Sequence, residues 1–165
     1  MKFHMIRKEK EITDERLLKK ILKTSKYITI ALSIENQPYL VSLSCGYDEQ
    51  RNCLYFHCAR EGKKIHYVKS NNITWGQALL DYGYSEDQEC THLYASVHFS
   101  GKVTLVENLE EKRQAMRCMM NQLSKNPEAL IAKYDFLPPE RLEKTGIGRI
   151  DIEHMSGKKS KEVTI

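Results

Sequence analysis

The chain has 165 residues, of which 41% are hydrophobic and 29% are charged, and its formal net charge is +4. This length suits one domain with its own hydrophobic core, so we expect a single domain over residues 1–165. The charge is mild and spread along the chain, and no apolar run reaches the ~18 residues that cross a bilayer, so we expect neither nucleic acid nor a membrane as a partner.

The first part of the chain predicts one helix followed by three strands. Thr13 and Asp14 are suitable N-cap residues, and an apolar face at helical spacing follows them, which predicts a helix over 13–24. Apolar and β-branched segments predict strands over 27–32, 39–47 and 53–58. The connections between these strands are short, which favours antiparallel hairpins.

The second part predicts further strands and helices. In chain order we expect a helix over 62–70, a strand over 73–80, a polar loop over 82–89, a strand over 92–107 that bends at Gly101, helices over 109–123 and 127–137, a strand over 147–153, and a mobile basic tail over 156–165. Asn108 and Glu111 form a capping pair for the helix that starts at 109. On this helix Met116, Met119 and Met120 repeat at helical spacing, which indicates packing against the barrel.

These elements together predict a mainly β fold with appended helices. Six mostly antiparallel strands with short connections favour a closed or split β-barrel, which we expect to span about 26–107 and 147–153.

Five cysteines stand at positions 45, 53, 58, 90 and 118. Their number is odd and they form no CxxC pair, which favours buried thiols in a reducing compartment over a disulfide framework. The first ten residues are charged and hold no apolar signal segment, so we expect a cytoplasmic protein. Cys90 and His92 have no further ligand cluster beside them, so we predict no metal site.

The segment 54–64, with the sequence LYFHCAREGKK, suits a phosphate group. An apolar strand ending in His57 runs into a short turn, and Gly62 then opens a helix that begins with Lys63 and Lys64. Free backbone N–H groups at a helix start, the helix dipole and two ammonium groups all favour an anion, and a phosphate monoester carries roughly −1.5 to −2 charges. The alternative is a solvated turn with ordinary surface lysines.

The order of this and other segments resembles the pyridoxamine 5'-phosphate oxidase-like family of FMN-binding split β-barrels, and within it the nitroimidazole-reductase-like branch. The similarity is carried by residues 39–48, 54–64, 94–97, 101–103 and 110–113, and it extends over about 5–158. It implies the split-barrel fold, FMN as cofactor, a small-molecule substrate, and a homodimer with the cofactor between the subunits.

The resemblance also implies roles for individual residues. It assigns the phosphate to Lys63 and Lys64, the phosphate or ribityl chain to His57 and Cys58, the ring edge to the backbone of Ser42, Leu43 and Ser44, and a covering position to Trp75. His57 is in addition the candidate catalytic residue. Each assignment has an alternative: a core or surface histidine for His57, cross-strand hydrogen bonds for the two serines, and a core position for Trp75.

The chain departs from this branch at two positions of the ring-side wall. Ser42 stands where the branch often has proline, and Cys45 where it often has an aromatic residue. The chain also lacks the arginine- and tryptophan-containing ending of the true pyridoxamine phosphate oxidases, so vitamin B6 oxidation is not assigned.

We therefore expect an FMN-binding reductase or oxidase that transfers a hydride through the flavin N5. The alternatives are a non-enzymatic split barrel that binds haem or another flavin, and an RNA-binding barrel.

Overall fold

The structure is a computed structural model, and it describes residues 5–86 and 91–165. Its strands form one antiparallel sheet in the order β1-β7-β4-β3-β2-β5-β6, and β6 pairs again with β7, which closes the ring. The six strands of the ring are β2 (Tyr27–Ile34), β3 (Gln37–Asp48), β4 (Cys53–Cys58), β5 (Ile73–Ser85), β6 (Thr91–Leu105) and β7 (Gly146–Lys159). The predicted six-stranded antiparallel barrel is confirmed. A further strand, β1 (Glu11–Ile12), adds two residues to the sheet beside β7 and was not predicted from the sequence.

The barrel closes because β7 is long enough to pair with two neighbours in succession. Its first residues pair with β4, and from Gly148 onwards it pairs with β6 as far as Lys159. The register between β6 and β7 shifts between Ser100 and Gly101, and a side chain on Gly101 would collide with the carbonyl oxygen of Asp151. The bend predicted at Gly101 is therefore a β-bulge that lets the two backbones approach closely.

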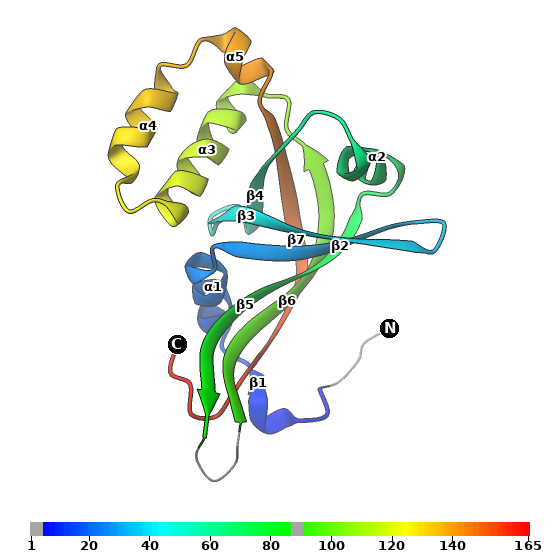
Figure 1. The fold of residues 1–165 in the computed structure, drawn as a ribbon, viewed down its shortest axis with the longest axis vertical. Helices are drawn as coiled ribbons and strands as arrows, with labels where there is room; N and C mark the ends of the chain where they lie inside the picture. The colour runs from blue at the N-terminus through cyan, green and yellow to red at the C-terminus, as the bar shows by residue number, and fades with distance from the viewer. Residues whose placement is uncertain (1–4, 87–90) are drawn as a thin grey trace.

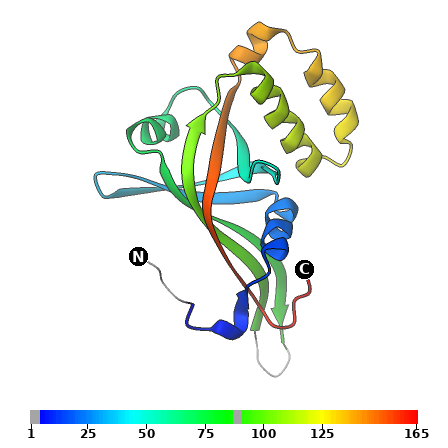
Figure 2. The same ribbon diagram turned by 180° about the vertical axis from the view of Figure 1, so that it is seen from behind.

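Five α-helices surround the barrel (Figures 1 and 2): α1 (Glu15–Thr24), α2 (Lys63–Ser70), α3 (Leu109–Leu123), α4 (Pro127–Asp135) and α5 (Pro139–Glu143). Two of the predicted caps are confirmed, because Asp14 accepts a hydrogen bond from the Arg16 N–H and Asn108 accepts one from the Glu111 N–H. In both views α3, α4 and α5 gather beside one end of the barrel, and the long β5–β6 hairpin extends from the other end.

Two predicted boundaries are wrong. Residues 82–85, expected in a polar loop, continue β5, because cross-strand pairing with β6 resumes at Tyr84 opposite His92 after a register shift. Residues 156–159, expected in a basic tail, belong to β7 and pair with β6. Both extensions contain polar residues because one side of each strand faces solvent, and such residues are typical of loops and tails in a sequence. The backbone pairing depends on the neighbouring strand, which the local sequence does not show.

The barrel core and α3 meet at one glycine. A Cβ atom on Gly46 would lie 2.6 Å from the backbone nitrogen of Met119, so only a glycine allows α3 to rest directly on β3. The side of α3 that faces the barrel buries Met116, Met119 and Met120 in a cluster with Tyr55. The predicted packing of the methionine stripe is thus confirmed. None of the described helices is both long and apolar enough to span a bilayer.

Candidate functional site

Although the ring of strands is closed, the pairing between β3 and β4 is short, and the part of β3 beyond it has an unpaired edge. This unpaired edge defines the candidate site. β3 pairs with β2 from Gln37 to Ser44, and with β4 only from Cys45 to Asp48. Over the described residues, the edge of β3 at Ser42, Leu43 and Ser44 therefore has no neighbouring strand on the β4 side. An unpaired strand edge presents backbone N–H and C=O groups at fixed spacing, which is a surface suited to hydrogen bonding a ligand.

A cavity of about 640 Å³ lies over this edge, between the barrel and helices α3 and α4. We call it the β3–α3 groove, and it is lined by Ser42, Leu43, Ser44, His57, Met116, Met119, Met120, Leu123, Ser124 and Leu130. Four of the eight residues predicted to bind the cofactor thus lie in one cavity. Residues 44 and 57 are separated in the sequence, but the short β3–β4 hairpin brings both to the same cavity.

The polar side chains of the groove differ in what they contact. The Ser42 hydroxyl lies 3.0 Å from the Thr29 hydroxyl on β2, which is the cross-strand bond that the sequence analysis gave as the alternative. Within the described residues, the Ser44 hydroxyl and the His57 ring have no hydrogen-bond partner, and both residues are exposed. Their polar atoms are therefore available to a ligand in the groove.

The opposite wall of the groove is apolar. Met116, Met119 and Met120 contribute from α3, and Leu130 contributes from α4. The helical spacing of these methionines predicts packing against the barrel, but spacing does not show that a packed face also borders an opening. Flexible, polarisable methionine side chains adapt to flat aromatic rings at a distance of about 5 Å.

The predicted turn and the helix start that follows it are confirmed. Gly62 has φ +103, in the left-handed region that favours glycine, and α2 starts directly after it with no side-chain cap. The two lysines diverge onto different rings: the Lys63 Nζ lies 4.6 Å from the centroid of Tyr39, and the Lys64 Nζ lies 5.5 Å from that of Phe56. Neither lysine lines the β3–α3 groove, so their phosphate-binding role stays a prediction.

Two other predicted residues lie outside the groove. Cys58 is buried on the inner face of the barrel, where burial raises the pKa of its thiol while the positive charges of Lys64 and Lys112 oppose the shift. Trp75 on β5 is 60% exposed, so the alternative of a core tryptophan is wrong. Side chains alternate between the two faces of a strand, and the preceding residue, Thr74, is buried. Trp75, which pairs with Ala31 on β2, therefore lies on the outer face of the sheet.

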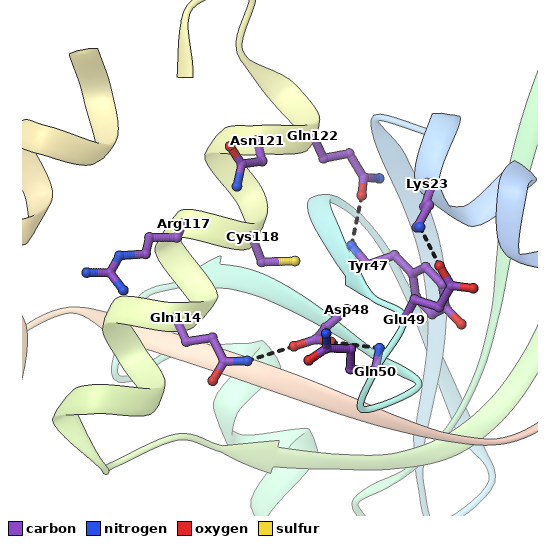
Figure 3. A pocket seen from close by; sticks show the side chains of 10 residues that line it. All are labelled: Lys23, Tyr47, Asp48, Glu49, Gln50, Gln114, Arg117, Cys118, Asn121 and Gln122. Carbon is purple, nitrogen blue, oxygen red and sulfur yellow. Dashed lines mark hydrogen bonds and ion pairs between the residues drawn. The ribbon is translucent and has the colours of Figure 1, made fainter. Parts of the chain in front are cut away.

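A polar cavity of about 580 Å³ lies on another side of α3 (Figure 3). Its walls are largely occupied by their own hydrogen bonds: the Gln114 amide donates to Asp48, and Gln122 accepts from the Tyr47 N–H at 2.8 Å. Figure 3 shows both glutamines reaching from α3 to β3. We conclude that this cavity is a seam that holds α3 on the barrel.

The buried thiols beside this seam predict a loss of stability in alkali. Burial raises the pKa of Cys45 from 9.0 to about 12. Above pH 9.0 the unfolded chain releases a proton that the folded chain keeps, so each such group lowers the unfolding free energy by about 1.4 kcal/mol per pH unit until the folded pKa is reached. Urea denaturation of Cys45→Ala should show a shallower decline than the wild type above pH 9.0 and a constant offset between pH 7 and 8. Parallel curves throughout would contradict this assignment.

The described residues contain no group of three or more His, Cys, Asp or Glu side chains arranged to hold a metal ion. Cys90 of the Cys90–His92 pair lies outside the described residues. His92 lies within hydrogen-bonding distance of Asp81 on the neighbouring strand, with 2.9 Å between Nε2 and the carboxylate.

Solved structures share this architecture. A candidate 5-nitroimidazole antibiotic resistance protein from Bacteroides thetaiotaomicron is 25% identical, with a TM-score of 0.74 over 90% of this chain and 85% of that chain. A flavocytochrome from Azotobacter vinelandii is 16% identical, with a TM-score of 0.75 over 95% of this chain and 72% of that chain. An FAD and heme binding protein from Mycobacterium smegmatis is 17% identical, with a TM-score of 0.75 over 94% of this chain and 76% of that chain. The last two show the fold alone.

No curated protein sequence matches the chain. The family model described as pyridoxamine 5'-phosphate oxidase matches residues 14–159, which include the whole barrel and the helices around the groove. With a matching model over most of its length and the split barrel observed, the chain belongs to the pyridoxamine 5'-phosphate oxidase family.

Proposed function

We propose that this protein binds a flavin, FMN in particular, in the β3–α3 groove and acts as a small-molecule reductase or oxidase. One observation carries the proposal: the unpaired edge of β3 lies in the same cavity as the unpartnered polar groups of Ser44 and His57, opposite a methionine wall. Proteins with the same fold that are named for binding flavin support it, as does the similarity to the candidate nitroimidazole resistance protein.

The groove has the features that a flavin ring requires. A volume of about 640 Å³ lies within the usual range of small-molecule sites, about 300–1,000 Å³. The ring would lie between the strand edge and the methionines, with its polar edge toward the backbone of Ser42, Leu43 and Ser44. Bound FMN would supply hydride transfer through its N5 atom. His57 would then face the bound molecules, and the wall of α3 and α4 would exclude water from one side.

Lys63 and Lys64 are the proposed phosphate anchors, and a comparison of FMN with riboflavin tests them. Each lysine replaced singly by alanine should weaken FMN binding about tenfold, because a charged hydrogen bond contributes about 1.5–3 kcal/mol and both side chains are partly solvated. Riboflavin has no phosphate, so its affinity should stay unchanged in the same variants. Fluorescence titration of the flavin measures both constants, and equal losses for the two ligands would contradict the anchor.

We further propose a homodimer that covers the groove. The face of the sheet that carries Ser42 and Ser44 also exposes an apolar patch: Tyr27, Leu40, Ile73, Trp75 and Leu79. Cross-strand partners share a face, and Tyr27 pairs with Ser44 while Trp75 and Leu40 both pair with Ala31, so the patch is continuous with the groove. A second copy would bury this patch and complete the site. Sedimentation equilibrium should return twice the mass of 19.3 kDa.

The alternative is a non-enzymatic barrel that binds haem. Two proteins of the same fold favour it, since one is a flavocytochrome and the other binds both FAD and haem. The absorption spectrum of freshly purified protein separates the two functions, because a Soret band indicates haem, whereas an oxidised flavin shows a pair of broad bands in the near ultraviolet and the blue.

A cytoplasmic, reducing location is part of the proposal, and the free thiols of Cys45, Cys53, Cys58 and Cys118 support it.

A further inference from the structure

A small cavity at the C-terminal end of β4, where Cys58 lies, contains the side chain of a buried lysine. The cavity has a volume of about 80 Å³, and its lining includes Cys58, Arg60, Lys69, Glu107 and Lys112. Lys112, near the start of α3, is only 2% exposed. Lysine is almost never this buried without a partner of opposite charge, because removing its ammonium group from water is costly.

The partners of Lys112 do not neutralise it. Its Nζ donates to two backbone carbonyls at the end of α5, those of Leu142 (3.3 Å) and Glu143 (3.0 Å). No carboxylate of the described residues lies within ion-pair distance of this Nζ. An ammonium group has three N–H donors, so one remains without a partner in the described part of the chain.

A second cation lies beside the first. The Arg60 Nη1 donates to the same Glu143 carbonyl oxygen at 2.9 Å. Since both nitrogens bind one oxygen, Lys112 Nζ and Arg60 Nη1 are at most about 6 Å apart, the sum of their two distances from it. Glu107, which also lines the cavity, pairs with the other guanidinium nitrogen of Arg60 at 3.7 Å, but its side chain is mostly exposed. Two like charges at this separation repel each other unless an anion lies between them.

We propose that this cavity is a phosphate-binding site in which Lys112 and Arg60 supply the charge. A forked guanidinium and an ammonium group with a free N–H match the oxygens of a phosphate, and the cavity has room for one small ion. The site shares no lining residue with the β3–α3 groove, so binding of inorganic phosphate to it can be tested without a flavin. Its phosphate is either the free inorganic ion or the terminal group of a phosphorylated ligand.

Calorimetric titration of the flavin-free protein with inorganic phosphate tests the site. The wild type should show saturable binding, and Lys112→Met, which keeps the volume of the side chain but removes its charge, should bind at least about tenfold more weakly. Arg60→Gln provides a second variant at an exposed position, and it should also bind phosphate more weakly. Lys133→Met is the matched control, because Lys133 on α4 is exposed and lies outside this cavity, and its phosphate affinity should stay within about threefold of wild type.

Three outcomes would overturn the proposal: no saturable phosphate binding by the wild type, unchanged affinity in both Lys112→Met and Arg60→Gln, or saturation by chloride without any by phosphate. Two outcomes support it and identify the source of the phosphate. If FMN-loaded protein still binds inorganic phosphate, the free ion is the ligand. If FMN competes with phosphate, and Lys112→Met weakens FMN but not riboflavin, the site holds the phosphate of the ligand. A protein that binds phosphate but no flavin would refute the proposed function and leave this site standing.

Discussion

Replacing Ser44 with tryptophan should reduce flavin affinity by at least about 100-fold. Ser44 lies on the floor of the β3–α3 groove, exposed and without a side-chain partner in the described residues, opposite Met116, Met119 and Met120. An indole at this position would fill the space between the strand edge and the methionine wall. A ring that cannot enter loses both its hydrogen bonds to β3 and its apolar contacts, which together are worth about 3 kcal/mol or more.

The matched control is Ser33→Trp, which places the same side chain on an exposed position of β2 that does not line the groove. Its flavin affinity should equal that of the wild type. Visible absorption and fluorescence titration give the affinities, and circular dichroism shows whether each variant keeps its fold. If Ser44→Trp binds flavin as tightly as Ser33→Trp, the flavin lies elsewhere and the groove is not the cofactor site.

Replacing Glu111 with glutamine should destabilise the protein by about 2–4 kcal/mol. The Glu111 Oε1 accepts hydrogen bonds from the Tyr55 hydroxyl at 3.1 Å, from Arg51 at 3.2 Å and from Arg149. The side chains of Glu111 and Arg149 are only 18% and 23% exposed. Hydrogen bonds to Asp151 and then to Glu111 raise the pKa of Arg149, so the guanidinium stays charged, and it would lose one of its two carboxylate partners.

The neighbouring Glu110→Gln is the control for this change, because Glu110 lies in the same first turn of α3 but its side chain is 86% exposed. Its loss of charge should cost no more than about 0.5 kcal/mol. Urea denaturation of both variants measures the difference. Equal stability of the two would show that the network around Glu111 contributes nothing, and that α3 is held on the barrel by its methionines and glutamines alone.

Several features of this protein followed from the sequence because they depend on neighbouring residues. Asp14 and Asn108 cap their helices, α2 begins directly after Gly62, and β6 bends at Gly101. Short turns between apolar segments were enough to predict an antiparallel barrel. The order of the motifs was enough to identify the family, which the matching model over residues 14–159 confirms.

The make-up of the candidate site depended on contacts between distant parts of the chain. The family resemblance assigned Ser42, Ser44 and His57 to one site, but the sequence could not show that pairing between β3 and β4 stops at Cys45 and leaves an open edge. The opposite wall comes from α3 and α4, which follow much later in the chain, and helical spacing alone did not separate packing from lining.

What the sequence determined by itself is local: caps, turns, strand periodicity and the glycine that permits a close approach. Whether a side chain faces the core, a cavity or solvent was decided by the tertiary structure. Trp75 is exposed and Lys112 is buried, although tryptophan is usually largely buried in proteins and lysine is usually exposed. The physical reason is that burial depends on which surface covers a residue, and in a closed barrel that surface is supplied by strands and helices far away in the chain.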